Sequence, residues 1–142
     1  MTSPTNSPTL NPADAVAREL LAVTQQLLNS IVAGDWKTYE TLCDPSLTCF
    51  EAEARGQLVE GMAFHAFYFE PSGTPPPRRQ VTITQPHVRM LGDDAAVVSY
   101  VRLTQSVDGN GAAQTSRYEE TRVWQKKDGA WRHVHFHRSA NS

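Results

Sequence analysis

Apolar residues in the first third of the chain recur at the period of a helix. One stripe has three- and four-residue spacing: Val16, Leu20, Val23, Leu27 and Ile31. It predicts a long amphipathic helix that lies across a large apolar surface. A cap-type residue followed by a proline, Asn11-Pro12, favours the start of this helix, and Gly34 favours its end.

Shorter elements are predicted after this helix. Asp35 is a capping residue for a second helix that runs to Leu42 and ends before Asp44-Pro45. A short strand is expected over residues 47–51 and a third helix over about residues 62–69. Residues 71–79 are rich in proline and predict a loop.

From Val81 onward the apolar period changes to two, which is typical of strands. Four strands are predicted, over residues 81–91, 95–107, 115–127 and 131–138. The glycine- and aspartate-containing turns between them have hairpin length, so the strands form an antiparallel meander. Pro86 marks a bulge or an edge in the first of these strands. Helices followed by long antiparallel strands indicate an α+β fold, with a bent sheet around the first helix and a cleft at its open end.

Composition narrows the classes of function. The 142 residues fit one domain, and 13 Lys+Arg against 15 Asp+Glu argue against a nucleic-acid partner. No apolar run approaches the roughly 20 residues of a membrane helix, and the N-terminus lacks the pattern of a secretory signal. Cys43 and Cys49 are too few for a disulfide framework and are expected to pack as small hydrophobes in a reduced, cytoplasmic setting. Residues 1–11 are predicted to be a disordered tail, 12–139 one folded domain and 140–142 a short C-terminal tail.

Three arginines lie on predicted strand faces that are otherwise apolar. Alternation gives each arginine its neighbours: Arg102 with Val98 and Tyr100, Arg122 with Trp124, and Arg138 with Val134 and Phe136. A guanidinium buried in such a surface costs on the order of several kcal/mol unless it is paired. The basic pairs elsewhere, Arg78-Arg79 and Lys126-Lys127, are expected to be solvated loop or turn charges.

Two hypotheses for these arginines stay open. In one they line a pocket that binds an anion. In the other they belong to an internal ion-pair network, with Glu120 on the face of Arg122 and with Glu51 or Glu60 reaching across. Even if they line a pocket, one arginine is expected to pair with Glu120, because cations converging in a low-dielectric cup repel one another.

Two further groups suggest chemistry that we do not expect. His133, His135 and His137 alternate along one predicted strand face, but side chains two apart lie roughly 7 Å from each other. We therefore expect no metal site there, and place these histidines at an interface or on a solvated face. Glu51 and Glu53 share a face and resemble an acid–base pair, but charged neighbours are expected to lower their pKa values, which disfavours catalysis.

A series of short strings in this order resembles a known family. They are Asp44-Pro45, Phe50-Glu51, Leu58–Gly61, Phe64-His65, Phe67–Glu70, Pro86–Val88, Gly92–Ala96, Tyr100–Gln105, Glu119–Trp124 and Val134–Ser139. From about Ala15 to Ser139 the chain resembles the association (hub) domain of calcium/calmodulin-dependent protein kinase II. The Phe67–Glu70 and Val134–Ser139 strings are the most specific part of this resemblance.

The resemblance implies a fold, an assembly and a pocket. The fold is that of nuclear transport factor 2 (NTF2-like, SnoaL-like): a curved antiparallel sheet around a long N-terminal helix, a cystatin-like cone. Members dimerise and stack into two-tiered rings, dodecamers or tetradecamers. Their deep pocket binds small carboxylates, and by motif Arg102, Arg122 and Arg138 fall on its arginines, with Tyr39 and His65 near its rim.

The sequence therefore predicts a self-assembling hub protein with an arginine-lined pocket and no cofactor. We expect a stand-alone hub without a kinase, and no calmodulin binding, because the first helix carries only Arg18 as a basic residue. The alternatives are a small-molecule enzyme of the same fold (isomerase, dehydratase or cyclase) using His65 with Glu51, or a scaffold with a vestigial pocket. The ligand, the cellular partner and the ring size stay open.

Overall fold

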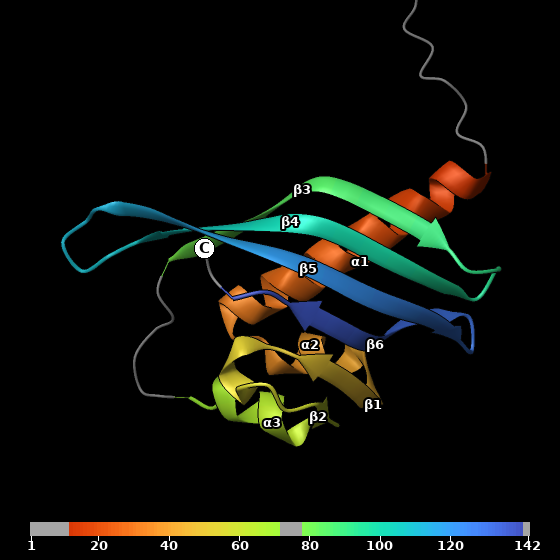
Figure 1. The fold of residues 1–142 in the computed structure, drawn as a ribbon, viewed down its shortest axis with the longest axis horizontal. Coiled ribbons are helices and arrows are strands. Elements are labelled where there is room, and N and C mark those ends of the chain that lie inside the picture. The colour runs from red at the N-terminus through yellow and green to blue at the C-terminus, as the bar shows by residue number, and fades with distance from the viewer. Residues whose placement is uncertain (1–11, 72–77, 141–142) are drawn as a thin grey trace, which may run out of the picture.

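The computed structural model describes residues 12–71 and 78–140. The predicted N-terminal tail, most of the proline-rich loop and residues 141–142 lie outside the described residues. The elements follow in this order: α1 (Pro12–Ala33), α2 (Trp36–Leu42), β1 (Cys43–Phe50), the 3-10 turn η1 (Ala52–Ala54), β2 (Val59–Glu60), α3 (Ala63–Ala66), the 3-10 turn η2 (Phe67–Phe69), β3 (Arg79–Met90), β4 (Ala95–Val107), β5 (Ala113–Lys127) and β6 (Ala130–Arg138). Figure 1 shows α1 lying along one face of a curved sheet.

Helix α1 supplies one side of the core, as its apolar stripe predicts. Leu20, Leu27 and Leu28 are fully buried, and α1 packs mainly against β3. Thr24 is buried in the same row, where its hydroxyl donates a 2.7 Å hydrogen bond to the Leu20 carbonyl and so loses no partner on burial. The helix ends before Gly34, whose φ of +68° suits glycine. Among the helices described, none has the length and apolar character to cross a membrane.

The short elements after α1 follow the predicted order with shifted ends. The Asp35 side chain caps α2 by accepting a 3.1 Å hydrogen bond from the Thr38 amide, as expected. Strand β1 begins at Cys43 rather than near residue 47, and the two-residue β2 is too short to predict from a period. The third predicted helix divides into α3 and η2.

The sheet has the order β2-β1-β6-β5-β4-β3. The antiparallel meander from β3 to β6 is confirmed, with Asp128 and Gly129 at positive φ in the β5–β6 turn. Pro86 lies in a bulge of the edge strand β3, where the pairing shifts between Thr84 and His87. Strand β1 joins the sheet parallel to β6, a contact between distant segments that hairpin signals cannot reveal.

A second bulge overturns the prediction for the histidines of β6. The pairing with β5 shifts between Val123, opposite His135, and Trp124, opposite His133. One extra residue reverses the alternation of side chains. As a result, His133 is fully buried on the core side, whereas His137 stays exposed on the outer face. The three histidines do not share a face.

Candidate functional site

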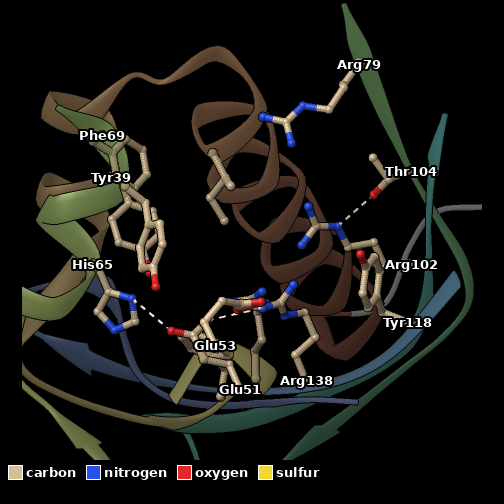
Figure 2. A pocket seen from close by; sticks show the side chains of 14 residues that line it. Tyr39, Glu51, Glu53, His65, Phe69, Arg79, Arg102, Thr104, Tyr118 and Arg138 are labelled. Atoms are coloured by element: carbon tan, nitrogen blue, oxygen red, sulfur yellow. Dashed lines mark hydrogen bonds and ion pairs between the residues drawn. The ribbon is translucent and has the colours of Figure 1, made fainter. Parts of the chain in front are cut away.

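A cavity of about 320 Å³ opens between the helices and the concave face of the sheet. Its charged lining consists of arginines and glutamates: Glu51, Glu53, Arg79, Arg102, Arg122 and Arg138. Aromatic side chains complete the wall, with Tyr39 and Phe69 beside His65 on the helical side and Tyr118 near Arg102 on the sheet side (Figure 2). The strands β4, β5 and β6 each present one arginine to this space because their core-facing positions alternate.

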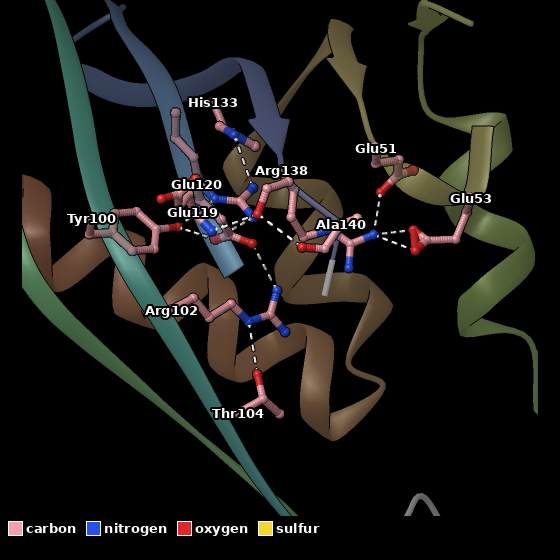
Figure 3. A network of polar contacts seen from close by, with 12 residues as sticks. Glu51, Glu53, Tyr100, Arg102, Thr104, Glu119, Glu120, His133, Arg138 and Ala140 are labelled. Atoms are coloured by element: carbon pink, nitrogen blue, oxygen red, sulfur yellow. Dashed lines mark hydrogen bonds and ion pairs between the residues drawn. The ribbon is translucent and has the colours of Figure 1, made fainter. Parts of the chain in front are cut away.

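Deep in the wall, four side chains form the buried ion-pair cluster: Tyr100, Arg102, Glu120 and Arg122. The Glu120 carboxylate accepts a 3.1 Å hydrogen bond from Arg102 Nη1 through Oε2 and another of 3.1 Å from Arg122 Nη2 through Oε1. Tyr100 donates its hydroxyl to the same Oε1 at 2.5 Å. Figure 3 shows Tyr100 and Arg102 directed at the Glu120 carboxylate. The sequence predicts that Glu120 pairs with one arginine, whereas in the structure it pairs with two.

The charges of this cluster stabilise one another. Burial opposes ionisation of Glu120, yet Arg122 and Arg102 hold its pKa at about 2. Burial also works against the Arg122 charge, and Glu120 nevertheless raises the pKa of that guanidinium. Arg122 further donates from Nε to the Tyr100 hydroxyl at 2.8 Å, and its Nη1 lies 3.4 Å from His133 Nε2. Each nitrogen of Arg122 therefore already has a partner.

Near the cavity mouth, Glu51, Glu53 and Arg138 form the rim cluster. Arg138 Nη2 lies 3.4 Å from Glu51 Oε2 and 2.5 Å from Glu53 Oε1. Glu53 comes from η1, and its side chain is 37% exposed against 14% for Arg138. The expectation that neighbours lower the pKa of Glu51 is wrong: burial raises it and outweighs the opposing effect of Arg138. Glu60, the other proposed partner, is exposed on β2 and does not line the cavity.

A further arginine faces the cavity from the first residue of β3. The sequence predicts Arg79 to be a solvated loop charge, whereas it lines the cavity while remaining exposed. Within residues 12–71 and 78–140 it has no carboxylate in ion-pair distance. Strand alternation could have predicted that Arg79 faces the cavity, because it is two residues before the buried Val81 and so shares its face.

Comparison with known proteins agrees with this architecture. The family model "Calcium/calmodulin dependent protein kinase II association domain" matches residues 16–142. The chain belongs to this association-domain family. The delta subunit of calcium/calmodulin-dependent protein kinase type II from Oryctolagus cuniculus is 49% identical over 136 residues, which cover 94% of this chain and 26% of the relative. The chain thus spans about a quarter of the length of that relative.

Solved association domains match along nearly the whole chain. The association domain of C. elegans CaMKII has a TM-score of 0.86 at 46% identity, covering 92% of this chain and all of the other. The CaMKII hub homology domain of Chlamydomonas reinhardtii has a TM-score of 0.83 at 55% identity, covering 87% of this chain and 96% of the other. An NTF2-like protein from Salmonella enterica, 24% identical over 92% of this chain and 94% of its own, with a TM-score of 0.73, shows the wider fold alone. The predicted α+β, NTF2-like fold is confirmed.

In this association domain, all five residues that the sequence singles out lie around one cavity: Tyr39, His65, Arg102, Arg122 and Arg138. Tyr39 and His65 differ from the expected rim position, since they are only 2% and 5% exposed and belong to the wall. The His65 ring lies 6.0 Å from Tyr39 and 5.8 Å from Phe136, centroid to centroid. Burial, reinforced by Arg122, lowers the pKa of His65 to about 4, so the imidazole is neutral at physiological pH.

Sequence reasoning misses one more neighbour in the association domain. Cys49, expected to pack as a small hydrophobe, is fully buried with its Sγ 3.7 Å from His65 Nε2. Cys49 lies in β1 and His65 in the four-residue helix α3, and their contact depends on how α3 packs against β1. No periodicity of the sequence encodes that contact.

Proposed function

We propose that this association domain self-assembles into a closed homo-oligomer built from two-fold dimers. These dimers form a ring, either a dodecamer or a tetradecamer. Two neighbouring aromatic side chains support a covered surface: Phe67 and Tyr68 are 67% and 55% exposed, and their ring centroids lie 5.3 Å apart. Adjacent exposed apolar side chains of this size are typical of protein interfaces. A two-fold contact lets one such surface cover its own copy.

We propose further that the cavity binds small carboxylates, and the observation that carries this proposal is its surplus of guanidinium. Four arginines (79, 102, 122 and 138) meet three glutamates (51, 53 and 120), which leaves one formal positive charge. Arg79 is unpaired among the described residues, and Arg138 bonds its glutamates through Nη2 alone. A carboxylate fits such donors through charge-assisted hydrogen bonds.

The relatives are kinase subunits, and this chain matches the association domain within them. Gathering catalytic partners around the ring is therefore part of the proposal. The alternative of an isomerase, dehydratase or cyclase gains no support from the family match.

Multi-angle light scattering tests the assembly. We expect the parent chain to be far larger than its 15.8 kDa monomer at micromolar concentration. Phe67→Glu should reduce the assembly, because it places a charge in the covered surface. Leu91→Glu is the matched control, since Leu91 is 53% exposed in the β3–β4 turn, which lies far from α3 in Figure 1. A monomeric parent at micromolar concentration would refute self-assembly.

Calorimetry with a panel of small carboxylates tests the cavity. Affinity should be modest, because a small ligand contributes few atoms, and chloride should compete. Arg79→Gln should weaken binding, whereas Arg89→Gln should not, since Arg89 is exposed on the same strand but does not line the cavity. If no carboxylate binds at millimolar concentration, the arginines are structural only.

A further inference from the structure

Three possible metal ligands meet beside the cavity. Cys49 of β1, Glu51 immediately after β1 and His65 of α3 each bring one ligand atom to within 4.8 Å of the others. Cys49 Sγ lies 3.7 Å from His65 Nε2, and Glu51 Oε1 lies 3.7 Å from His65 Nδ1. Bonds of about 2.0–2.3 Å in a tetrahedral zinc site place ligand atoms roughly 3.3–3.7 Å apart. The two 3.7 Å separations are to different nitrogens of His65, and the three ligand atoms that include a single nitrogen lie within 4.8 Å of one another, so the side chains have to close by up to about an ångström around one ion.

The second observation is an oxygen without a hydrogen-bond partner. Glu51 Oε1 is buried and has no hydrogen-bond partner of ordinary geometry among the described residues, although the neighbouring Cys49 thiol favours the ionised carboxyl; the side chain is 10% exposed. Its other oxygen, Oε2, faces Arg138. Leaving a buried charged acceptor unsatisfied is unfavourable. A cation held jointly by Glu51, Cys49 and one nitrogen of His65 would supply the missing partner.

The other cysteine shows what distinguishes this group. Cys43 is also buried, and its Sγ lies 3.5 Å from His133 Nδ1. No carboxylate completes that pair among the described residues, whereas Glu51 completes the pair of Cys49 and His65. Cys43 with His133 is therefore a packed thiol–imidazole contact, and it provides an internal control.

A nucleophilic site is the competing interpretation of Cys49, His65 and Glu51, since thiol, base and orienting carboxylate follow one another. Burial contradicts it. Cys49 is 0% exposed and does not line the cavity. A substrate carbon cannot reach such a sulfur. A bound metal ion, in contrast, is small and deprotonates the thiol that coordinates it.

We propose that Cys49, Glu51 and His65 bind a thiophilic divalent transition-metal ion, Zn²⁺ or Co²⁺, with a fourth position open to the cavity. Thiolate and carboxylate together balance the two charges of the ion, and neutral imidazole is the form that ligates metals. The ion takes one imidazole nitrogen, so the Glu51 carboxylate turns by about an ångström to reach it. Arg138 keeps Glu53 as its partner.

Co²⁺ titration of the full chain under reducing conditions tests this site, in a buffer free of small carboxylates so that the cavity proposal is not involved. We expect a thiolate-to-Co²⁺ charge-transfer band at one ion per chain, abolished by added Zn²⁺. Cys49→Ser should lose the band and bind at least about tenfold more weakly. Cys43→Ser should keep the charge-transfer band and the Co²⁺ affinity of the parent. Zn²⁺ should raise the Tm of the parent and not that of Cys49→Ser.

Glu51→Gln provides a second variant that keeps the cysteine and the shape of the side chain. It should retain a folded circular-dichroism spectrum and weaken Co²⁺ binding about tenfold. A parent chain that binds Co²⁺ without a thiolate band has used exposed histidines instead, and overturns the proposal. The proposal also fails if Cys43→Ser and Cys49→Ser lose the band equally, or if Glu51→Gln binds as tightly as the parent.

Discussion

The buried ion-pair cluster and the rim cluster use the same residue types around one cavity but differ in their access to water. In the buried ion-pair cluster the side chains of Glu120 and Arg122 are 0% and 1% exposed. In the rim cluster the side chain of Glu53 is 37% exposed, and among the described residues it pairs with Arg138 alone. Burial makes the first set of contacts a fixed part of the fold, because removing one partner leaves an uncompensated charge. In the second set water reaches the contact of Glu53 with Arg138, whereas Glu51 and Arg138 themselves are only 10% and 14% exposed, so Glu53 is the glutamate that an anion can readily replace.

The largest difference between the clusters should appear in stability. Glu120→Ala leaves Arg102 and Arg122 buried without their shared carboxylate, so the free energy of unfolding should fall by about 3–5 kcal/mol. Glu53→Ala should cost under about 1 kcal/mol. Urea denaturation monitored by circular dichroism measures both. Glu119→Ala is the matched control on β5, because its side chain is 68% exposed. Equal losses for Glu120 and Glu53 would remove the distinction between the clusters.

The pH dependence of stability should reveal the same difference between the two clusters, through the carboxyl of Glu120. The pKa of Glu120 falls from an ordinary value of 4.5 to about 2 on folding, so Glu120 stabilises the fold fully above pH 4.5. As pH falls from 4.5 to 2 the unfolded chain binds a proton that the folded chain does not, and a stabilisation of about 3 kcal/mol is lost. Glu120→Gln should remove this part of the slope, whereas Glu53→Gln should keep it. A parent slope unchanged by Glu120→Gln would contradict the ionised cluster.

The regular parts of the fold could be predicted because local rules decide them. The stripe of α1, the cap at Asp35, the bulge at Pro86 and the hairpin meander all follow from neighbours in sequence. The parallel contact of β1 with β6 joins segments about 90 residues apart, and no local signal encodes it. The bulge that buries His133 contains neither glycine nor proline, so alternation placed that histidine on the wrong face.

The site could be predicted in part for the same reason. Alternation along β4, β5 and β6 brought Arg102, Arg122 and Arg138 to the concave face, and the family resemblance added Tyr39 and His65. Which arginine still has room for a ligand depends on three-dimensional partners. Every nitrogen of Arg122 already contacts Glu120, Tyr100 or His133, and sequence alone cannot rank it below Arg138.

Lysine substitutions should separate the structural arginine from the ligand-binding one. Arg122→Lys keeps the charge but loses the fork that reaches both Glu120 and Tyr100, so it should cost about 2 kcal/mol of stability. Arg138→Lys should change stability by less than about 1 kcal/mol and weaken carboxylate binding about tenfold. Calorimetry combined with denaturation measures both properties. If Arg122→Lys alone weakens binding and leaves stability intact, the roles assigned to the two arginines are reversed.

The smallest expected effect concerns Glu53 as a carboxylate that already occupies Arg138. A ligand that binds Arg138 has to displace Glu53, whose contact with that guanidinium is partly solvated. Glu53→Gln removes the competing charge while keeping the size of the side chain, so carboxylate affinity should rise about threefold, within the range of an exposed ion pair. Glu60→Gln is the control, because Glu60 is exposed on β2 outside the cavity. Calorimetry at low ionic strength gives the sharpest contrast, since added salt screens the competition. An affinity that falls in Glu53→Gln would mean that Glu53 orients Arg138 for the ligand, and the rim cluster would then be as fixed as the buried one.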